Sequence, residues 1–232
     1  MDYLILGTLP YVTIVVFLLG MGYRFFVWIK TPQPAAITLF PAPHGGPATF
    51  LSVVRESFLF PGLFRGDRFF WGLAWVFHFT LALIFIGHIR VFTDFPKLWA
   101  ALGIDADRMS AGIGGAAGMI VGVFALLLFL RRLAVLRVRE ISQFSDFFAL
   151  VLVLAILLTG NALRFGGHFD LSLTRAYFAD LFTFTAGASS RPDNPMFTLH
   201  VLLAQILIMV IPYSKILHFG GIFFTQAVIH KS

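Results

Sequence analysis

The stretch FFWGLAWVFHFTLALIFIGHIRVF, residues 69–92, decides the fold of this chain. It holds no Asp, Glu, Lys or Arg before Arg90. A helix needs about 20 predominantly apolar residues to cross the hydrocarbon core of a bilayer. The stretch therefore predicts a transmembrane helix, and it places two histidines, His78 and His88, inside that helix.

The same pattern recurs along the whole chain. Of its 232 residues, 59% are hydrophobic and 12% are charged, whereas a soluble domain carries roughly 25% charged residues. We therefore expect an all-α integral membrane protein, a single domain over residues 1–232 built as a five-transmembrane-helix bundle. The predicted helices cover residues 5–29, 70–93, 111–130, 146–165 and 196–219.

Lysine and arginine are divided unequally between the two ends of these predicted helices. Eleven fall at one end: Arg24, Lys30, Arg55, Arg65, Arg68, Arg131, Arg132, Arg137, Arg139, Lys215 and Lys231. Six fall at the other: Arg90, Lys97, Arg108, Arg164, Arg175 and Arg191. The positive-inside rule then places the N-terminus outside, and the C-terminus and the connection 31–68 in the cytoplasm. The predicted location is the inner (cytoplasmic) membrane, as a multi-pass protein.

Composition also limits the function. The net charge of +6 is scattered around apolar segments, so it indicates contact with the lipid bilayer and not with nucleic acid. The chain has no cysteine, so it cannot ligate an iron–sulfur cluster through thiolates.

A second pair of histidines lies in MFTLHVLLAQILIMVIPYSKILHFGG, residues 196–221. An ionisable residue inside a membrane segment is costly and indicates a functional site. In the predicted topology the second helix runs outward and the fifth runs inward, so His88 and His200 share the outer half. His78 and His218 then share the inner half. The histidine spacings of the two helices disagree. His78 and His88 are ten residues apart, which spans roughly 15 Å of helix, whereas His200 and His218 are eighteen residues apart, which spans roughly 27 Å.

Two imidazoles per site, with no Cys, Asp or Glu beside them to complete a four-ligand site, favour two b-type haems over zinc or copper. A non-redox membrane anchor whose histidines only form hydrogen bonds stays open. The candidates to bind the haem propionates, or else to act as interface residues, are Arg90, Arg131, Arg132, Tyr213, Ser214 and Lys215.

Several motifs together resemble the gamma-subunit cytochrome b of respiratory nitrate reductases over nearly the full length. They are the histidines at 78 and 88, GGAAG at 114–118, RRLAVLRVR at 131–139, TFTAGASS at 183–190, TLHVLLA at 198–204 and IPYSKILH at 211–218. The phrase RESFLFPGLFRGDRFFWGLAWVFH, residues 55–78, is more similar to the branch found with heterodisulfide reductases and dissimilatory sulfite reduction.

The resemblance implies two haems b, an inner one on His78 and His218 and an outer one on His88 and His200. It also implies that menaquinol binds beside the outer haem, with Gly87, His88 and Arg108 as candidates. A lysine lines that site in nitrate reductases, but alanine stands at its place, about residue 106. Arg108 is the nearest basic residue.

The implied function is menaquinol oxidation near the outer face, with electrons passing to a cytoplasmic iron–sulfur subunit of heterodisulfide-reductase type. Further membrane and outer-face cytochrome subunits are possible partners. The alternatives are the gamma subunit of a nitrate-reductase-type molybdoenzyme and a quinone reductase with electrons flowing in the opposite direction.

Overall fold

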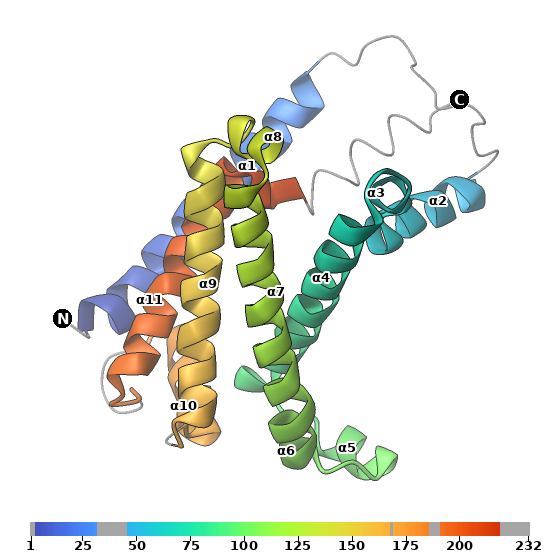
Figure 1. Cartoon of the computed structure of the whole chain (residues 1–232). Coiled ribbons are helices and arrows are strands. Elements are labelled where there is room, and N and C mark those ends of the chain that lie inside the picture. Colours follow the sequence, from blue (N-terminus) through green and yellow to red (C-terminus); the bar gives the residue numbers. More distant parts are fainter. Residues whose placement is uncertain (1–2, 32–45, 168, 186–190, 219–232) are drawn as a thin grey trace.

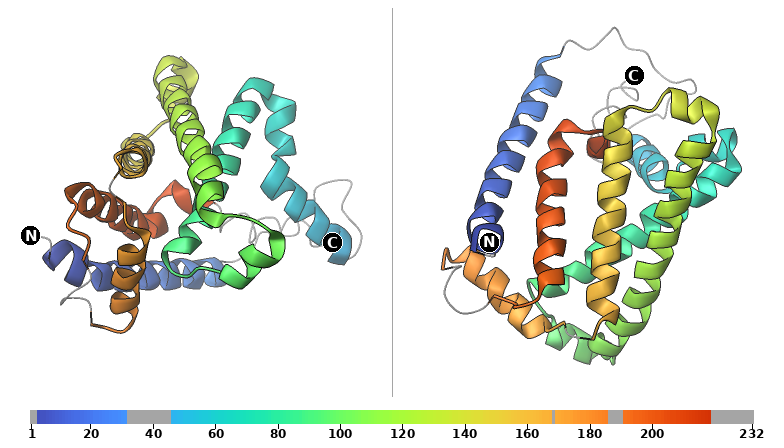
Figure 2. Two further views of the ribbon diagram at one scale, coloured as in Figure 1. Left: turned by 90° about the horizontal axis from the view of Figure 1, so that it is seen from below. Right: turned by 60° about the vertical axis from the view of Figure 1, so that its left-hand side comes forward.

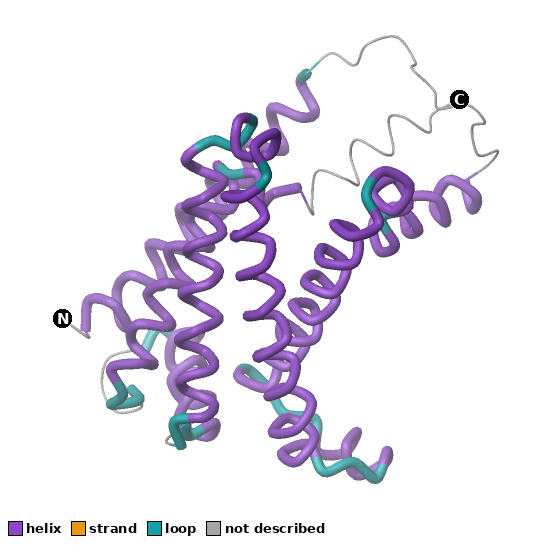
Figure 3. The backbone as a smooth tube through the Cα atoms, in the orientation of Figure 1, coloured by secondary structure: helices purple, strands orange, loops and turns teal. Residues whose placement is uncertain are grey.

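The computed structural model describes residues 3–31, 46–167, 169–185 and 191–218. Within these ranges every regular element is a helix (Figures 1 and 3). The all-α fold class is therefore confirmed. The first part of the connection 31–68, up to residue 45, lies outside the described residues, and its second part forms two short helices.

Five helical segments are long and apolar enough to cross a membrane. The first two are Leu4–Lys30, made of η1 (Leu4–Thr8) and α1 (Leu9–Lys30), and Arg68–Val91, made of α4 (Arg68–His88) and η2 (Ile89–Val91). The third is Ala106–Ala134, made of α6 (Ala106–Met109), η3 (Ser110–Gly114) and α7 (Gly115–Ala134). The fourth is α9 (Phe144–Phe165), and the fifth is Pro195–Tyr213, made of α11 (Pro195–Val210) and η4 (Ile211–Tyr213). The prediction of five membrane-spanning helices is thus confirmed, and the chain is a multi-pass membrane protein.

Short helices cover both ends of the bundle. One end carries α2 (Gly46–Leu59), α3 (Pro61–Gly66) and α8 (Leu136–Glu140), and we call it the α8 end. The other carries α5 (Pro96–Leu102), α6 and α10 (Leu171–Phe182), and we call it the α10 end (Figure 1). The sequence-based topology predicts that the α10 end faces outward.

Side-chain caps fix where three of the long helices begin. Asp67 accepts a hydrogen bond from the backbone N–H of Phe70, and α4 starts behind it. Gln143 and Asp146 form a reciprocal capping box at the start of α9. Asn194 caps α11, whose first residue, Pro195, has no N–H to leave unsatisfied.

The spanning helices pack in an open series. Helix α4 packs against α7, α7 against α9, α9 against α11, and α11 against α1 (Figures 1 and 2). One buried cluster joins the first three of these helices through Phe77, Val121, Ala125 and Leu157. About half of the large apolar side chains in the described residues are exposed on the helix surfaces, as expected where lipid takes the place of water.

The fifth span differs from the prediction, because α11 ends at Val210 and not at residue 219. Pro212 follows, and proline has no N–H to donate and clashes with the preceding helical turn. The chain then makes a 3-10 turn (η4), an extended residue at Ser214 and a second 3-10 turn, η5 (Lys215–Leu217). His218 therefore does not lie on one straight helix with His200.

Candidate functional site

His88 and His200 face each other at the α10 end of the bundle. His88 is the last residue of α4, and His200 lies in the second turn of α11. Their imidazole centroids are 6.4 Å apart, and the two ring planes are inclined by 18°. The structure therefore brings together the first of the two pairs that the sequence predicts.

His78 and His218 meet nearer the α8 end. Their ring centroids are 5.8 Å apart and the planes are almost perpendicular, at 88°. The ring of Phe60 packs edge-on against His78, with centroids 5.4 Å apart. Phe60 itself has a positive φ of 49°, an uncommon backbone conformation at the bend between α2 and α3. The second predicted pair is thus also present.

The end of α11 removes the mismatch between the two histidine spacings. In α4, ten residues separate His78 from His88, and in α11 ten residues separate His200 from Val210, so each segment rises about 15 Å. The remaining eight residues do not continue the helix, because they form η4 and η5. This turn brings His218 to the height of His78.

Every one of the four imidazoles has its Nδ1 within hydrogen-bonding distance of an oxygen. The partners are the carbonyls of Ala74 (2.7 Å from His78), Ile84 (2.7 Å from His88) and Lys215 (2.9 Å from His218), and the hydroxyl of Thr159 (3.0 Å from His200). A carbonyl only accepts, so Nδ1 of His78, His88 and His218 carries the proton. That tautomer leaves the lone pair on Nε2, which is the usual arrangement of a metal-binding histidine.

The distances also fit a metal held between two imidazoles. With metal–nitrogen bonds of about 2.0 Å on both sides, the ring centroids lie roughly 6 Å apart. Among the described residues, no group of three or more His, Cys, Asp or Glu could hold a bare metal ion. A donor set of two histidines suits haem iron, because the porphyrin supplies the remaining four nitrogens. The residues present therefore fit two haems.

Three of the cations proposed for the propionates lie at the α8 end and pair with carboxylates. Arg131 binds Asp67 at 3.1 Å and lies over the ring of Phe70 at 4.1 Å. The carboxylate of Asp146, almost fully buried, receives Lys215 at 2.8 Å and Arg132 at 3.6 Å. These ion pairs fix the cations at the α8 end of the bundle, the end nearer His78 and His218, and their role toward propionates stays a prediction.

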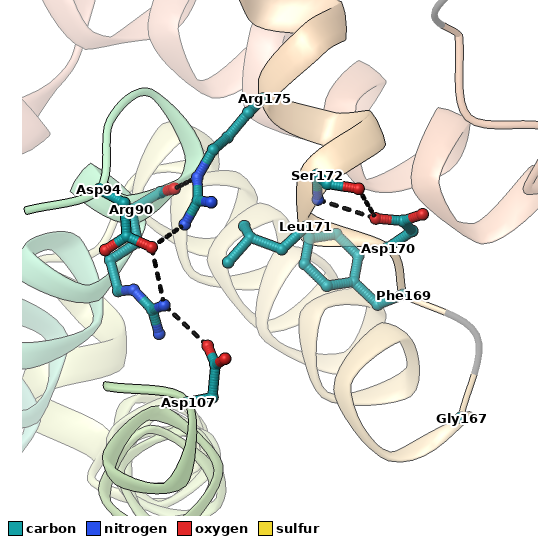
Figure 4. A pocket seen from close by; sticks show the side chains of 9 residues that line it. All are labelled: Arg90, Asp94, Asp107, Gly167, Phe169, Asp170, Leu171, Ser172 and Arg175. Carbon is teal, nitrogen blue, oxygen red and sulfur yellow. Dashed lines mark hydrogen bonds and ion pairs between the residues drawn. The ribbon is translucent and has the colours of Figure 1, made fainter. Parts of the chain in front are cut away.

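Arg90 is buried at the α10 end, in an ion-pair network (Figure 4). Its guanidinium donates to the Ala106 carbonyl at 2.8 Å, to Asp107 at 2.7 Å and to Asp94 at 3.2 Å. Arg175, from α10, donates to Asp94 and to the Arg90 carbonyl, both at 2.7 Å. The network therefore ties η2, α6 and α10 together at this end of the bundle, and the sequence did not single out Arg175 for this role.

Beside this network lies an open cavity of about 600 Å³. Its walls are Arg90, Asp94, Asp107, Arg175, Gly167 and residues 169–172 (Figure 4). The hydrogen bond from Arg90, with those from Trp99 and the Phe95 backbone, lowers the pKa of Asp94 to about 2. Asp94 is thus charged throughout the physiological range.

The remaining predicted site residues lie on the surface or at turns. Gly87 and Arg108 are exposed at the α10 end. Tyr213 is also exposed, beside Gly20 of α1, and Ser214 caps η5 by accepting from the backbone N–H of Ile216. Thr159, which contacts His200 from α9, was not predicted. A threonine in an apolar helix carries no signal of a partner 41 residues away.

Known proteins are similar in sequence to this chain over a range that includes all four histidines. A family model described as the nitrate reductase gamma subunit matches residues 61–228. The Hdr-like menaquinol oxidoreductase cytochrome b-like subunit of Archaeoglobus fulgidus is 29% identical, covering 93% of this chain and 76% of the relative. The subunit of the same name from Archaeoglobus profundus is 29% identical over 94% of this chain and 76% of its own length. The nitrate reductase gamma chain of Bacillus subtilis is 28% identical over 62% of this chain and 68% of the relative.

Proposed function

The chain belongs to the nitrate reductase gamma subunit family, and on that premise we propose that it is a dihaem cytochrome b that oxidises menaquinol. Family and relatives make it a membrane cytochrome b subunit of a respiratory complex. The proposal adds two haems, a quinol site beside His88 and His200, and electron transfer across the membrane to a cytoplasmic iron–sulfur subunit.

One observation carries this proposal. Two histidine pairs connect α4 with α11 and the turn after it, and the ring centroids within each pair lie 6.4 Å and 5.8 Å apart. Haem held by these pairs supplies one-electron chemistry, while the protein supplies binding and orientation. Two histidines per iron would suit electron transfer and not the binding of a substrate to the metal.

The side chains at each end have different tasks in this function. At the α10 end, Gly87, His88 and Arg108 are the candidates to contact menaquinol, whose two protons leave on the outer side. At the α8 end, Arg131, Arg132 and Lys215 surround the exit of electrons toward a cytoplasmic partner. Their positive charges also compensate the propionates, which are costly anions near the membrane.

The 29% identity to Hdr-like menaquinol oxidoreductase subunits extends over more than nine-tenths of the chain. This similarity favours an iron–sulfur partner of heterodisulfide-reductase type. The match to a nitrate reductase gamma chain supports a second candidate, in which the partner is a nitrate-reductase-type molybdoenzyme. The protein that copurifies with the chain distinguishes the two partners. Faster haem reduction by a reduced partner than by a menaquinol analogue would instead indicate the quinone reductase direction.

The test of the haem assignment is a pyridine haemochrome assay on the purified complex. We expect two haems b per chain, and one fewer in each of the variants His88→Ala and His78→Ala. His44→Ala, a histidine outside both pairs, serves as control and keeps two. We also expect His88→Ala to abolish reduction by a menaquinol analogue, since its haem is the one nearest the quinol.

Two results would contradict the proposal. Wild-type protein without haem b would make the chain a non-redox anchor. Two haems retained in His88→Ala would refute the pairing of His88 with His200.

A further inference from the structure

Thr159 holds the outer histidine of α11 from the neighbouring helix α9. Its side chain is buried, and its Oγ1 lies 3.0 Å from Nδ1 of His200. The same oxygen lies 2.9 Å from the Ala155 carbonyl and 3.0 Å from the Ile156 carbonyl of its own helix. Three polar atoms therefore surround a single hydroxyl group.

The hydroxyl of Thr159 can serve both its own helix and His200. A hydroxyl has one proton and two lone pairs. Its proton is donated to a carbonyl of α9, that of Ala155 or Ile156. Its oxygen can then accept from the Nδ1–H of His200, in the tautomer that leaves the lone pair on Nε2, as in the other three histidines.

This arrangement makes His200 different from the other three histidines. His78 and His88 each donate to the carbonyl four residues earlier in α4, and His218 donates to the carbonyl three residues earlier. Their ring orientations are therefore set by their own segments. The orientation of His200 depends instead on the packing of α9 against α11.

The residue after Thr159 supports the same contact. A Cβ on Gly160 would lie 3.1 Å from Cε1 of His200, closer than most real contacts of this kind. The glycine therefore leaves room for the ring to lie flat against α9, beside the hydroxyl. Thr159 and Gly160 together form the surface on which the imidazole rests.

We propose that Thr159 is a positioning residue: its hydroxyl fixes the tautomer and ring orientation of His200 for the outer haem. The inference rests on the proposed function, since it needs haem between His88 and His200. When a metal-binding histidine donates a hydrogen bond from the ring nitrogen that does not bind the metal, here Nδ1, the ligating nitrogen becomes more basic and the properties of the metal change. Loss of the acceptor should weaken haem binding and, because the imidazole then donates less charge to ferric iron, raise the reduction potential of the outer haem.

The test compares Thr159→Val with Thr80→Val in the purified complex. Thr80 is a matched control, because it is buried and its hydroxyl donates to the carbonyls of Val76 and Phe77 in its own helix. In Thr159→Val we expect one of the two haems to shift to a higher midpoint potential in a spectroelectrochemical titration. The same haem should be lost roughly 10–100-fold more readily to a haem acceptor such as apomyoglobin. Thr80→Val should leave the midpoint potentials and the rate of haem loss unchanged. Thr159→Ser, which keeps the hydroxyl, should have the wild-type potential and the wild-type rate of haem loss.

The inner haem would report on folding in the same sample, because the hydroxyl of Thr159 bonds to His200 and to carbonyls of its own helix, not to His78 or His218. If Thr159→Val fails to fold, the pair Thr159→Ala and Thr159→Ser makes the same comparison. Haem-loaded protein whose outer potential and haem retention do not change in Thr159→Val would overturn this assignment alone. Wild-type protein without haem would overturn the proposed function, and this assignment with it.

Discussion

At the residue scale, Asp94 shows how much structure depends on one carboxylate outside the spanning helices. It accepts hydrogen bonds from Arg90, Arg175 and the indole N–H of Trp99, and so joins η2, α5 and α10. Each ion pair of this kind is worth little when exposed, but here three donors converge on one acceptor. The carboxylate therefore helps to hold η2, α5 and α10 in place relative to one another.

The lowered pKa of Asp94, about 2, makes this contribution dependent on pH. Because the pKa of an unfolded aspartate is about 3.9, the charged form stabilises the fold fully above that value. The stability is then lost as the pH falls through the folded pKa. We expect Asp94→Asn to unfold at a lower temperature than wild type between pH 8 and about pH 4, with the difference disappearing near pH 2.

Thermal unfolding in detergent, followed by circular dichroism at several pH values, measures this difference. Asp170→Asn is a suitable comparison, because Asp170 caps α10 and forms no ion pair with Arg90 or Arg175. A difference for Asp94→Asn that persisted at pH 2 would show that its charge is not responsible.

At the element scale, the turn after α11 determines where the inner histidine lies. Helix α1 approaches it closely at Gly20, and Arg24 donates to the Pro212 carbonyl at 2.7 Å. The turn is thus held from α1 as well as from its own chain. Lys215 then ties it to Asp146 of α9.

We therefore expect Gly20→Ala to displace this turn and to weaken the inner haem selectively. A Cβ at Gly20 would lie 2.8 Å from both Cβ of Pro212 and the hydroxyl of Tyr213, which is closer than real contacts allow. Overpacking of this kind costs about 1–3 kcal/mol. Gly22→Ala is the matched control, since nothing lies within 4 Å of its Cβ position.

Reduced-minus-oxidised spectra and haem content separate the two variants. Gly20→Ala should retain the outer haem and lose part of the inner one, and Gly22→Ala should retain both. Equal loss of both haems in Gly20→Ala would indicate general unfolding and not displacement of the turn.

The sequence predicts the five spanning helices and both histidine pairs, because apolar length and charge distribution are local properties. It did not predict where α11 ends, although Pro212 is a local signal that a helix stops. The contact between Thr159 and His200 has no such signal. It depends on the rotation of two packed helices about their axes, which composition and spacing do not determine.

At the scale of the whole molecule, the open series leaves α4 joined to α11 mainly through the two histidine pairs. Among the described elements, the close partners of α4 are α7 with the η3 segment that precedes it, and α3 and η2, which adjoin α4 in sequence. Haem bound at both pairs would therefore link α4, at one end of the series, to α11 and the turn that follows it. A ligand that binds only the folded state also stabilises that state.

We expect protein prepared under haem limitation to unfold at a lower temperature than haem-loaded protein. Faster amide exchange should be concentrated in α4 and η5, while α9, packed on both sides by α7 and α11, should change little. Hydrogen–deuterium exchange with mass spectrometry measures this pattern. A uniform change along the chain would argue against haem as a link between α4 and α11.

The packing of α1 against α11 and η4 has a consequence for biosynthesis. Among the described spans, Leu4–Lys30 leaves the ribosome before the others, but its neighbour Pro195–Tyr213 follows only after more than four-fifths of the 232 residues have been made. Until then α1 faces lipid or the insertion machinery, and only its own apolar length keeps it in the bilayer. Closure of the helix bundle is therefore a late event in synthesis. A chain whose synthesis ends before α11 lacks the helix against which α1 packs.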